Sequence, residues 1–534
     1  LLASSAASDV YKRQYPHSAI GLGSLVGHLK KHTCLSIVKH TSSKSKLPLF
    51  LWGGFLLLCS LVSCMKEEDY STSPSDLLRF SKDTLDFGVV ISGQPTQTYT
   101  FMVYNPHDKS IRIPSVYLQG GTTSDFRVNV DGAYLENGNG TDFEIASHDS
   151  MRVFLFLNTP ESDADQPIPT EDKLVFITQG GAQQEVVLKG SGQSVIPLKG
   201  TIITRDTLLD AKRPYQIFDS LVVAEQANLK LAAGVRLYFH PNASLLVDGK
   251  IEATGSIEQP VTFRGDRLGN MFSQQPYDRI PGQWGGIILR GSSYGNHLSY
   301  CDIHSGTFGI RCDSSDISME KLRIENSIIH NVSGNGLAVR GANIFAGNCQ
   351  ITNAGGDCVQ LIGGNSTFIH CTIGRFYVFQ GGEGVALRFT NEDNETHFPL
   401  QKADFHNCII TGYAADEIMG TPSDKYDEET FNYLFNKCLL NTPEIENGHA
   451  NGCLWETDAD PYAREKNFTP EFDLKQLLFN FELAPTSRAV NSADAQIAKD
   501  YYPTDRLGRS RLSDDGPDLG CYEMYPSAET KRTR

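Results

Sequence analysis

The sequence predicts an all-β protein in which a β-sandwich is followed by a right-handed, single-stranded parallel β-helix. Three observations point to this fold class. Residues 79–195 alternate apolar and polar side chains over seven short segments, and residues 196–450 repeat a short motif at intervals near 22 residues. The chain is also rich in turn formers, with 48 glycines and 24 prolines among 534 residues. At about 100 to 200 residues per domain, this length accommodates two to four domains.

The first part of the chain is expected to carry targeting information rather than a folded domain. Residues 1–40, including the run at 9–14, are interpreted as a sequence-assembly scar or an untranslated leader. Residues 41–63 combine two lysines with a 16-residue apolar run at 47–62, which predicts a signal peptide. A membrane-spanning helix is the alternative, but this run falls short of the roughly 20 residues that cross a bilayer.

The segment that ends at Cys64 resembles the signal peptide and lipobox of a bacterial lipoprotein, with the triplet Leu-Val-Ser before the cysteine. The resemblance implies that Cys64 is acylated and that the protein is anchored to the outer membrane, facing the cell exterior. Lys66, Glu67 and Glu68 resemble the export signal of surface lipoproteins of Bacteroidetes, and a solvated acidic tether is the alternative. Residues 64–78 would then form the acylated tether.

Residues 79–195 predict a β-sandwich, because seven short alternating segments are separated by turn signals. The motifs at 85–88, 103–106 and 188–192 resemble Ig-like domains of the ASH type, which recur as spacers and interaction modules. The stretch contains no cysteine, so the inter-sheet disulfide of antibody domains is not expected. This domain is predicted to hold the next one away from the membrane.

Residues 196–450 carry the repeated motif that predicts the coils of the β-helix. Each copy places Cys or Ser two positions before Ile or Leu, and these small residues follow one another after 26, 22, 22, 37 and 30 residues. Some coils are therefore expected to carry inserted loops. The copies begin at Tyr300, Asn326, Asn348, His370, Asn407 and Lys437.

A second apolar column follows in several coils, beginning at Gly309, Gly336, Cys358 and Gly384. Because side chains two apart share one face of a strand, both columns are predicted to stack inside the solenoid. The cysteines of the first column are then expected to be buried and free, and disulfides between adjacent coils are the alternative. No metal site is predicted on them, because no Cys-x-x-Cys pair converges there.

Residues 451–525 are predicted to form the last coils and a cap over the open edge of the final coil, followed by a tail at 526–534. The motifs at 505–509 and 517–523 resemble a C-terminal signature of bacterial β-helix proteins. Together with the upstream coils, they make the chain similar to surface lipoproteins of Bacteroidetes with β-helix repeats.

The candidate binding or catalytic residues lie on a predicted outward strip. Asn335, Asp357 and Glu383 come just before the second column on successive coils, and Arg340 and Arg388 are expected at equivalent positions nearby. Two carboxylates one coil apart could share a proton or a Ca²⁺ ion. A solvated face without a function is the alternative.

His304 and His330 also fall at equivalent positions of neighbouring coils. A stacked pair on the surface or at a turn is the leading interpretation, and a general base or a metal-binding pair is the alternative.

The tetrapeptide at 355–358, Gly-Gly-Asp-Cys, resembles the Gly-Asp-Asp-Cys motif of the polygalacturonase family, but a glycine replaces the first aspartate. The partner motifs of that family are missing, so its paired-carboxylate mechanism is not expected here.

Residues 64–534 hold 40 basic and 62 acidic groups, and this acidity argues against nucleic-acid binding. The expected function is that of a surface lipoprotein whose β-helix binds a glycan or a surface protein, without catalysis and without a cofactor. The alternative is a polysaccharide lyase or glycoside hydrolase that acts on an acidic polysaccharide at Asp357 and Glu383, with Ca²⁺ as its possible cofactor.

Overall fold

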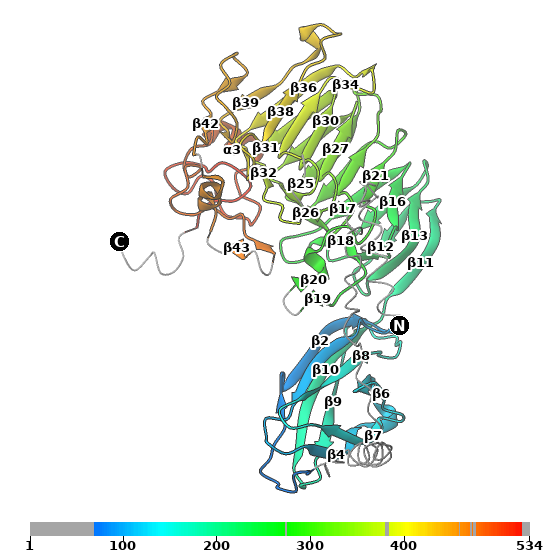
Figure 1. Ribbon diagram of the computed structural model, residues 1–534. Helices are drawn as coiled ribbons and strands as arrows, with labels where there is room; N and C mark the ends of the chain where they lie inside the picture. Colours follow the sequence, from blue (N-terminus) through cyan, green and yellow to red (C-terminus); the bar gives the residue numbers. More distant parts are fainter. Residues whose placement is uncertain are drawn as a thin grey trace, which may run out of the picture. The chain divides into compact units, whose positions relative to one another are not determined.

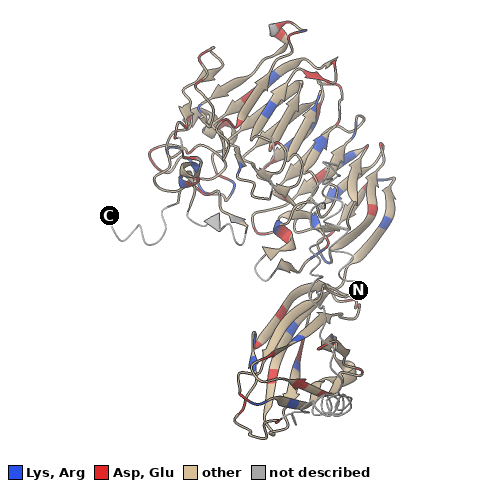
Figure 2. Ribbon diagram, viewed as in Figure 1, with Lys and Arg blue, Asp and Glu red and all other residues tan. Residues whose placement is uncertain are grey.

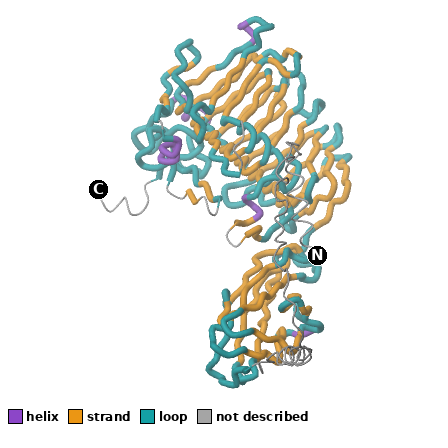
Figure 3. The backbone as a smooth tube through the Cα atoms, viewed as in Figure 1, coloured by secondary structure: helices purple, strands orange, loops and turns teal. Residues whose placement is uncertain are grey.

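A computed structural model of the chain describes residues 69–272, 275–379, 384–458, 460–469, 472–473 and 477–525. The predicted signal peptide, Cys64, the signal at Lys66, Glu67 and Glu68, and Glu383 lie outside the described residues. Within the described part, no helix is long and apolar enough to cross a membrane. Strands dominate the described residues (Figures 1 and 3), which confirms the predicted all-β class.

The N-terminal domain contains two five-stranded sheets, as predicted for a sandwich. All seven expected segments are strands, and β1, β6 and β7 are added to them. The apolar positions of the alternating segments face one buried cluster that includes Phe101, Val153 and Phe176. One sheet has the order β1 (Arg79–Phe80), β3 (Tyr99–Tyr104), β8 (Ser150–Leu157), β5 (Phe126–Val130) and β6 (Ala133–Tyr134), and the other has the order β2 (Thr84–Ile91), β10 (Gln183–Gln193), β9 (Ile168–Ile177), β4 (Ile111–Leu118) and β7 (Asn139–Ile145).

Residues 196–455 form a parallel β-helix with three ladders of strands (Figure 1). Each strand pairs in parallel with the equivalent strand of the next coil, as the repeated motif predicted. The first strands are β11 (Ile196–Ile203) and β13 (Tyr215–Val223), and β13 pairs with the first strand of two ladders.

Ladder A contains the first column of the sequence motif: β15 (Arg236–Phe239), β18 (Val261–Gly265), β23 (Cys301–His304), β26 (Ile328–Val332), β29 (Gln350–Ala354), β32 (Thr372–Arg375), β37 (Ile409–Gly412), β40 (Leu439–Leu440) and β42 (Leu454–Trp455). Ladder B contains the second column: β16 (Ser244–Val247), β21 (Ile287–Leu289), β24 (Ile310–Cys312), β27 (Leu337–Arg340), β30 (Val359–Ile362), β33 (Leu387–Thr390) and β38 (Ile418–Thr421).

Ladder C is a separate ten-stranded sheet: β12 (Thr207–Leu209), β14 (Asn228–Leu231), β17 (Lys250–Thr254), β22 (Asn296–Ser299), β25 (Glu320–Glu325), β28 (Asn343–Gly347), β31 (Gly364–Ile369), β36 (Leu400–His406), β39 (Leu434–Asn436) and β41 (Ala450–Asn451). Inserted segments carry the hairpins β19 (Asn270–Phe272)/β20 (Gln275–Pro276) and β34 (Glu392–Asp393)/β35 (Thr396–His397), and the short helices η2 (Tyr277–Arg279) and η3 (Glu428–Thr430).

The corner between ladders C and A depends on one backbone conformation. The residue before each small residue of the motif has a positive φ near 50°, and asparagine occupies this position in three coils. Asparagine adopts the left-handed region more readily than most residues with a side chain. The recurring motif therefore encodes a one-residue bend followed by a strand. These bend residues are Tyr300, Asn326, Asn348, His370, Asn407 and Lys437.

The interior of the coils is filled by stacked identical or similar side chains. The five motif cysteines are buried and free, as predicted, and Cys371 N–H points at Cys408 Sγ from 3.4 Å. Burial raises the pKa of the Cys371 thiol well above its ordinary value. Inside ladder C, Phe405 stacks between Phe368 and Phe435 with ring centroids 4.8 and 5.2 Å away. Such columns give each coil the same contacts as its neighbours.

The C-terminal segment, orange to red in Figure 1, packs against the outer side of ladder A. Here Ile409 and Leu439 point outward and are fully buried beneath a cluster that includes Phe468 and Leu519. The expectation that the 505–523 region covers the open edge of the last coil is therefore wrong, because this region contacts the side of earlier coils. The segment includes η4 (Pro461–Asn467), β43 (Phe472–Asp473), β44 (Leu478–Phe479) and α3 (Ala495–Tyr501).

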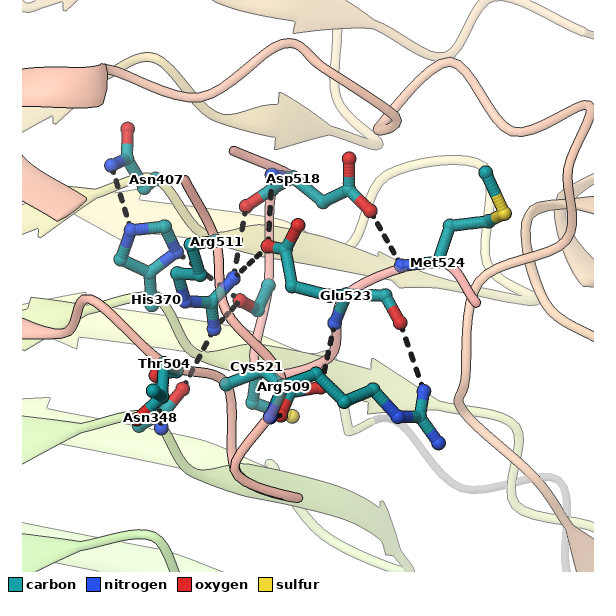
Figure 4. Close-up of polar contacts among 12 residues, drawn as sticks. Asn348, His370, Asn407, Thr504, Arg509, Arg511, Asp518, Cys521, Glu523 and Met524 are labelled. Carbon is teal, nitrogen blue, oxygen red and sulfur yellow. Dashed lines mark hydrogen bonds and ion pairs between the residues drawn. The ribbon is translucent and has the colours of Figure 1, made fainter. Parts of the chain in front are cut away.

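Polar contacts hold this segment in place (Figure 4). The fully buried guanidinium of Arg511 donates to Glu523 Oε1 at 2.6 Å and to Asn348 Oδ1 at 2.7 Å. Tyr522 donates its hydroxyl to Gln350 Oε1 at 2.7 Å, and Cys521 N–H donates to Thr372 Oγ1 at 3.1 Å. The resemblance to a C-terminal signature thus falls on residues that dock onto ladder A.

Candidate functional site on ladder A

The predicted outward strip does not form as expected, because Asp357 is a buried turn residue. Its side chain is 6% exposed, and its two oxygens accept from Val385 N–H at 3.0 Å and from Arg388 Nε at 2.8 Å. Asn335 supports the same turn by accepting from the Asp357 N–H at 2.9 Å. These contacts give Asp357 and Asn335 a structural role in joining adjacent coils.

The register of the next coil also differs from the prediction. Val359 of β30 pairs with Leu387 of β33, so Val385 rather than Glu383 is the equivalent of Asp357. Arg340 and Arg388 are not equivalent either, because Arg388 is in register with Gln360, whereas Arg340 is in register with Ile362.

The two arginines of the strip take part in separate ion pairs. Arg388 binds Asp357, and Arg340 Nε lies 3.0 Å from Asp393 Oδ2 while its guanidinium covers the ring of Phe398. The described part of the strip therefore serves the joints between coils and an inserted hairpin.

A different cluster of titratable side chains lies on the outer face of ladder A. His304 of β23 and His330 of β26 are in register, as predicted, and their rings lie 4.9 Å apart between centroids. Asp302 lies between them on the same face, because alternate residues of β23 point the same way. Its Oδ1 is 2.9 Å from His304 Nδ1 and 3.1 Å from His330 Nε2.

A loop residue completes this cluster. Asp278 of η2 places Oδ1 3.2 Å from His304 Nε2, so the imidazole of His304 bridges two carboxylates. The carboxylate of Asp278 also forms a close ion pair with Arg264 of β18. Arg264 precedes His304 by one coil in the ladder, since Phe263 pairs with Ile303. The site is thus built by three consecutive coils and one inserted loop.

The electrostatics of the cluster favour charged side chains. Burial acts to raise the pKa of Asp278, but the hydrogen bond from His304 and the charge of Arg264 outweigh it and lower the pKa to about 2. Burial opposes the charge of His304 as well, yet Asp302 and Asp278 raise its pKa to about 9. The pKa of Asp302 lies well below its ordinary range for the same reason, since His304 and His330 overcome the effect of burial.

The cluster is partly open to solvent. The side chains of Asp302 and His330 are 31% and 24% exposed, whereas His304 is 7% exposed. Beyond Ile328, the positions of ladder A in register with Asp302 are covered by the C-terminal segment. Figure 2 shows that charges of both signs are scattered over the β-helix, so this cluster is defined by its contacts rather than by a large charged patch.

The sequence revealed two of the five residues of this site. His304 and His330 were recognised from the spacing of the coils, and Asp302 could have been added because it lies two residues before His304. Asp278 and Arg264 were missed, because nothing local in the sequence indicates that the loop returns to ladder A.

One protein family matches part of the chain. Residues 283–427 match the family model described as "Right handed beta helix region", and no curated protein matches the chain. The family match and the three parallel ladders define the class of this protein: an all-β chain that contains a right-handed parallel β-helix.

The chain is also similar to parts of several solved structures. The pectate lyase Pel9A is 11% identical, with 62% of this chain and 88% of that chain covered at a TM-score of 0.26. The catalytic unit of a GH87 α-1,3-glucanase from Streptomyces thermodiastaticus is 9% identical, with 68% and 88% covered at a TM-score of 0.18. An ASH or PapD-like domain of human CEP192 is 9% identical, with 23% and 90% covered at a TM-score of 0.16.

Proposed function

We propose that this protein is a lipid-anchored surface protein whose β-helix binds a glycan on ladder A without cleaving it. The observation that carries the proposal is the row formed by Asp302 and His330 on adjacent coils, flanked by Asp278 and Arg264. Asp302, His330 and Asp278 are partly exposed and offer hydrogen-bonding groups to a ligand that lies along the coils, while Arg264 is largely buried and holds Asp278 in place. Sugar hydroxyls both donate and accept hydrogen bonds, so a mixed row of this kind suits them.

The contacts favour binding over cleavage. A glycosidase of the common type needs one protonated carboxyl as an acid and a second carboxylate as a base or nucleophile. Asp357 is committed to Arg388 and to a backbone N–H, so it is not available for this task. The carboxylates of Asp302 and Asp278 accept hydrogen bonds from histidine or pair with Arg264, and such contacts stabilise the ionised form.

The charge of the chain indicates the class of glycan. Residues 64–534 carry 22 more acidic than basic groups, and this field repels a polyanion. We therefore propose a neutral polysaccharide as the ligand, rather than the acidic polysaccharide of the enzymatic alternative.

In this proposal, the N-terminal part of the chain determines where the protein is located. Acylation at Cys64 would anchor the chain in the outer membrane, with Lys66, Glu67 and Glu68 directing it to the exterior. The sandwich would act as a spacer between the membrane and the β-helix. A protein on the cell surface is the second class of partner that a β-helix in this position could bind.

The test is affinity gel electrophoresis of the purified full chain with neutral and acidic polysaccharides, combined with an assay for new reducing ends and unsaturated products. We expect retention by a neutral glycan, a loss of affinity of at least tenfold in His330→Ala, and no cleavage product. His297→Ala is the matched control, because His297 forms a similar pair with Glu325 on ladder C at 3.0 Å. Cleavage of any glycan, retention by none of them, or equal retention of both variants would refute the proposal.

A further inference from the structure

The cluster on ladder A contains an arrangement that hydrogen bonding to a sugar does not require. One ligand atom each from Asp302, His304 and His330 lies within 4.8 Å of the others. Among the residues that the structure describes, this is the one group of three or more His, Cys, Asp and Glu side chains that meets such a condition. We propose that these three residues form a binding site for a divalent transition-metal ion, with Zn²⁺ as the reference ion.

The distances between the ligand atoms fit an ion that replaces the two protons shared between Asp302 and the two histidines. Asp302 Oδ1 lies 2.9 Å from His304 Nδ1 and 3.1 Å from His330 Nε2. Ligand atoms that surround a metal at about 2.1 Å are separated by roughly 3.0 to 3.4 Å in octahedral or tetrahedral geometry. The third pair of ligand atoms, on His304 and His330, is separated by no more than 4.8 Å, so side-chain rotations that shorten this distance would place all three atoms around one ion.

The surroundings of His304 match those of a metal ligand. Its Nδ1 faces Asp302, and its other nitrogen, Nε2, lies 3.2 Å from Asp278 Oδ1. Histidines that bind metals usually donate the second ring N–H to a carboxylate, which fixes the ring and makes it more basic. Arg264 in turn pairs with the carboxylate of Asp278, so the supporting residue is itself held.

The donor set and its exposure define the class of ion. Two imidazole nitrogens and one carboxylate suit Zn²⁺ and neighbouring first-row ions better than Ca²⁺, which prefers six to eight oxygen ligands. Three protein ligands leave at least one coordination position for water or another small ligand. Because Asp302 and His330 are partly exposed, that position would face solvent.

The inference does not rest on the proposed glycan binding, since it is tested without a glycan. The metal-stripped full chain is dialysed against ZnCl₂ at increasing concentrations, and bound zinc is measured by elemental analysis. We expect wild type to bind one ion more than His330→Ala, which lacks a ligand on the partly exposed side. His297→Ala, the control on ladder C, should bind as wild type does, and circular dichroism of each variant verifies its fold.

Two further measurements distinguish this site from zinc bound elsewhere on the chain, above all by cysteine. Asp278→Asn should weaken zinc binding by about 10- to 100-fold although Asp278 does not touch the ion, because it orients His304. Co²⁺ bound in place of Zn²⁺ should give visible ligand-field bands without the near-ultraviolet thiolate band that cysteine ligands produce. The inference would be overturned by equal zinc binding in wild type and His330→Ala, or by unchanged affinity in Asp278→Asn. It would also be overturned if the cobalt-loaded wild type showed a thiolate band that His330→Ala lacks.

Discussion

The docking of the C-terminal segment depends on Arg511, and its removal gives a sharp test of the fold. Its guanidinium is fully buried and donates to Glu523 Oε1, Asn348 Oδ1, Asp518 O and Gly520 O at 2.6 to 3.3 Å. Arg511→Met would keep most of the apolar volume but leave Glu523, 5% exposed in its side chain, without its cationic partner.

The expected loss follows from this burial. Breaking one partner of a buried ion pair costs about 3 to 5 kcal/mol where the other group stays charged without compensation. Burial raises the pKa of Glu523 to about 7, so the full loss is expected only well above that pH. At 1.4 kcal/mol for each factor of ten, the open form of the segment should become roughly 150- to 4,000-fold more populated. Arg509 provides a matched control two residues away. Its side chain is 24% exposed, pairs with Glu482 and donates to Glu523 O, so Arg509→Met should cost less than Arg511→Met, about 1 kcal/mol.

Amide hydrogen exchange read by mass spectrometry measures this change directly in peptides that cover 503–524. Protection there should fall in Arg511→Met, while peptides from the interior of ladder C keep theirs. The double variant Arg511→Met/Glu523→Gln should recover part of the protection, because it removes the stranded charge. If Arg511→Met and Arg509→Met lose the same protection, or if neither loses any, the reasoning from the buried pair is wrong.

Three other changes test separate parts of the structure. Phe405→Ala should lower the free energy of unfolding by about 3 to 5 kcal/mol in urea denaturation, because it removes the middle ring of a buried stack; a loss below 1 kcal/mol would contradict that role. Burial raises the pKa of Glu417 to about 7, so its contribution to stability should be present below about pH 4.5 and be lost as the pH rises through 7. Unfolding measured at pH 5 and pH 8 should show this decline, and Glu417→Gln should flatten it, whereas an unchanged slope in the variant would reject the assignment. Asp357→Asn should destabilise the turn that holds Arg388 by about 1 to 3 kcal/mol without changing retention by glycan gels, and a loss of retention at unchanged stability would restore the predicted strip.

The coils could be predicted because most of them repeat the same short sequence motif. A left-handed residue, a small buried residue and an apolar residue two positions later recur in the first column, so the sequence identified six strands of ladder A without any long-range information. The predicted alignment of the second column was wrong in one coil, where Val385, Leu387 and Phe389 are all apolar and buried. A shift by two residues keeps the same face of a strand inward, so the pattern could not distinguish the two registers.

The site was harder to predict than the fold. His304 and His330 belong to regular strands and could be aligned from their spacing, but Asp278 reaches them from a loop whose path the sequence does not reveal. Asp357 shows the opposite error, because an acidic residue at a coil corner looks exposed in the sequence. In the structure it satisfies a backbone N–H and an arginine, and this need is invisible until adjacent coils are placed together.

The lateral docking of the C-terminal segment has a consequence for biosynthesis. Ile409 and Leu439 point away from the interior of the solenoid and belong to a buried cluster most of whose members, such as Phe468 and Leu519, are translated later. During synthesis, complete coils would therefore carry an apolar flank until the last part of the chain arrives. A prematurely terminated chain would have well-formed coils and yet expose the kind of surface that chaperones and proteases recognise. The C-terminal segment is therefore needed to cover the apolar outer side of these coils.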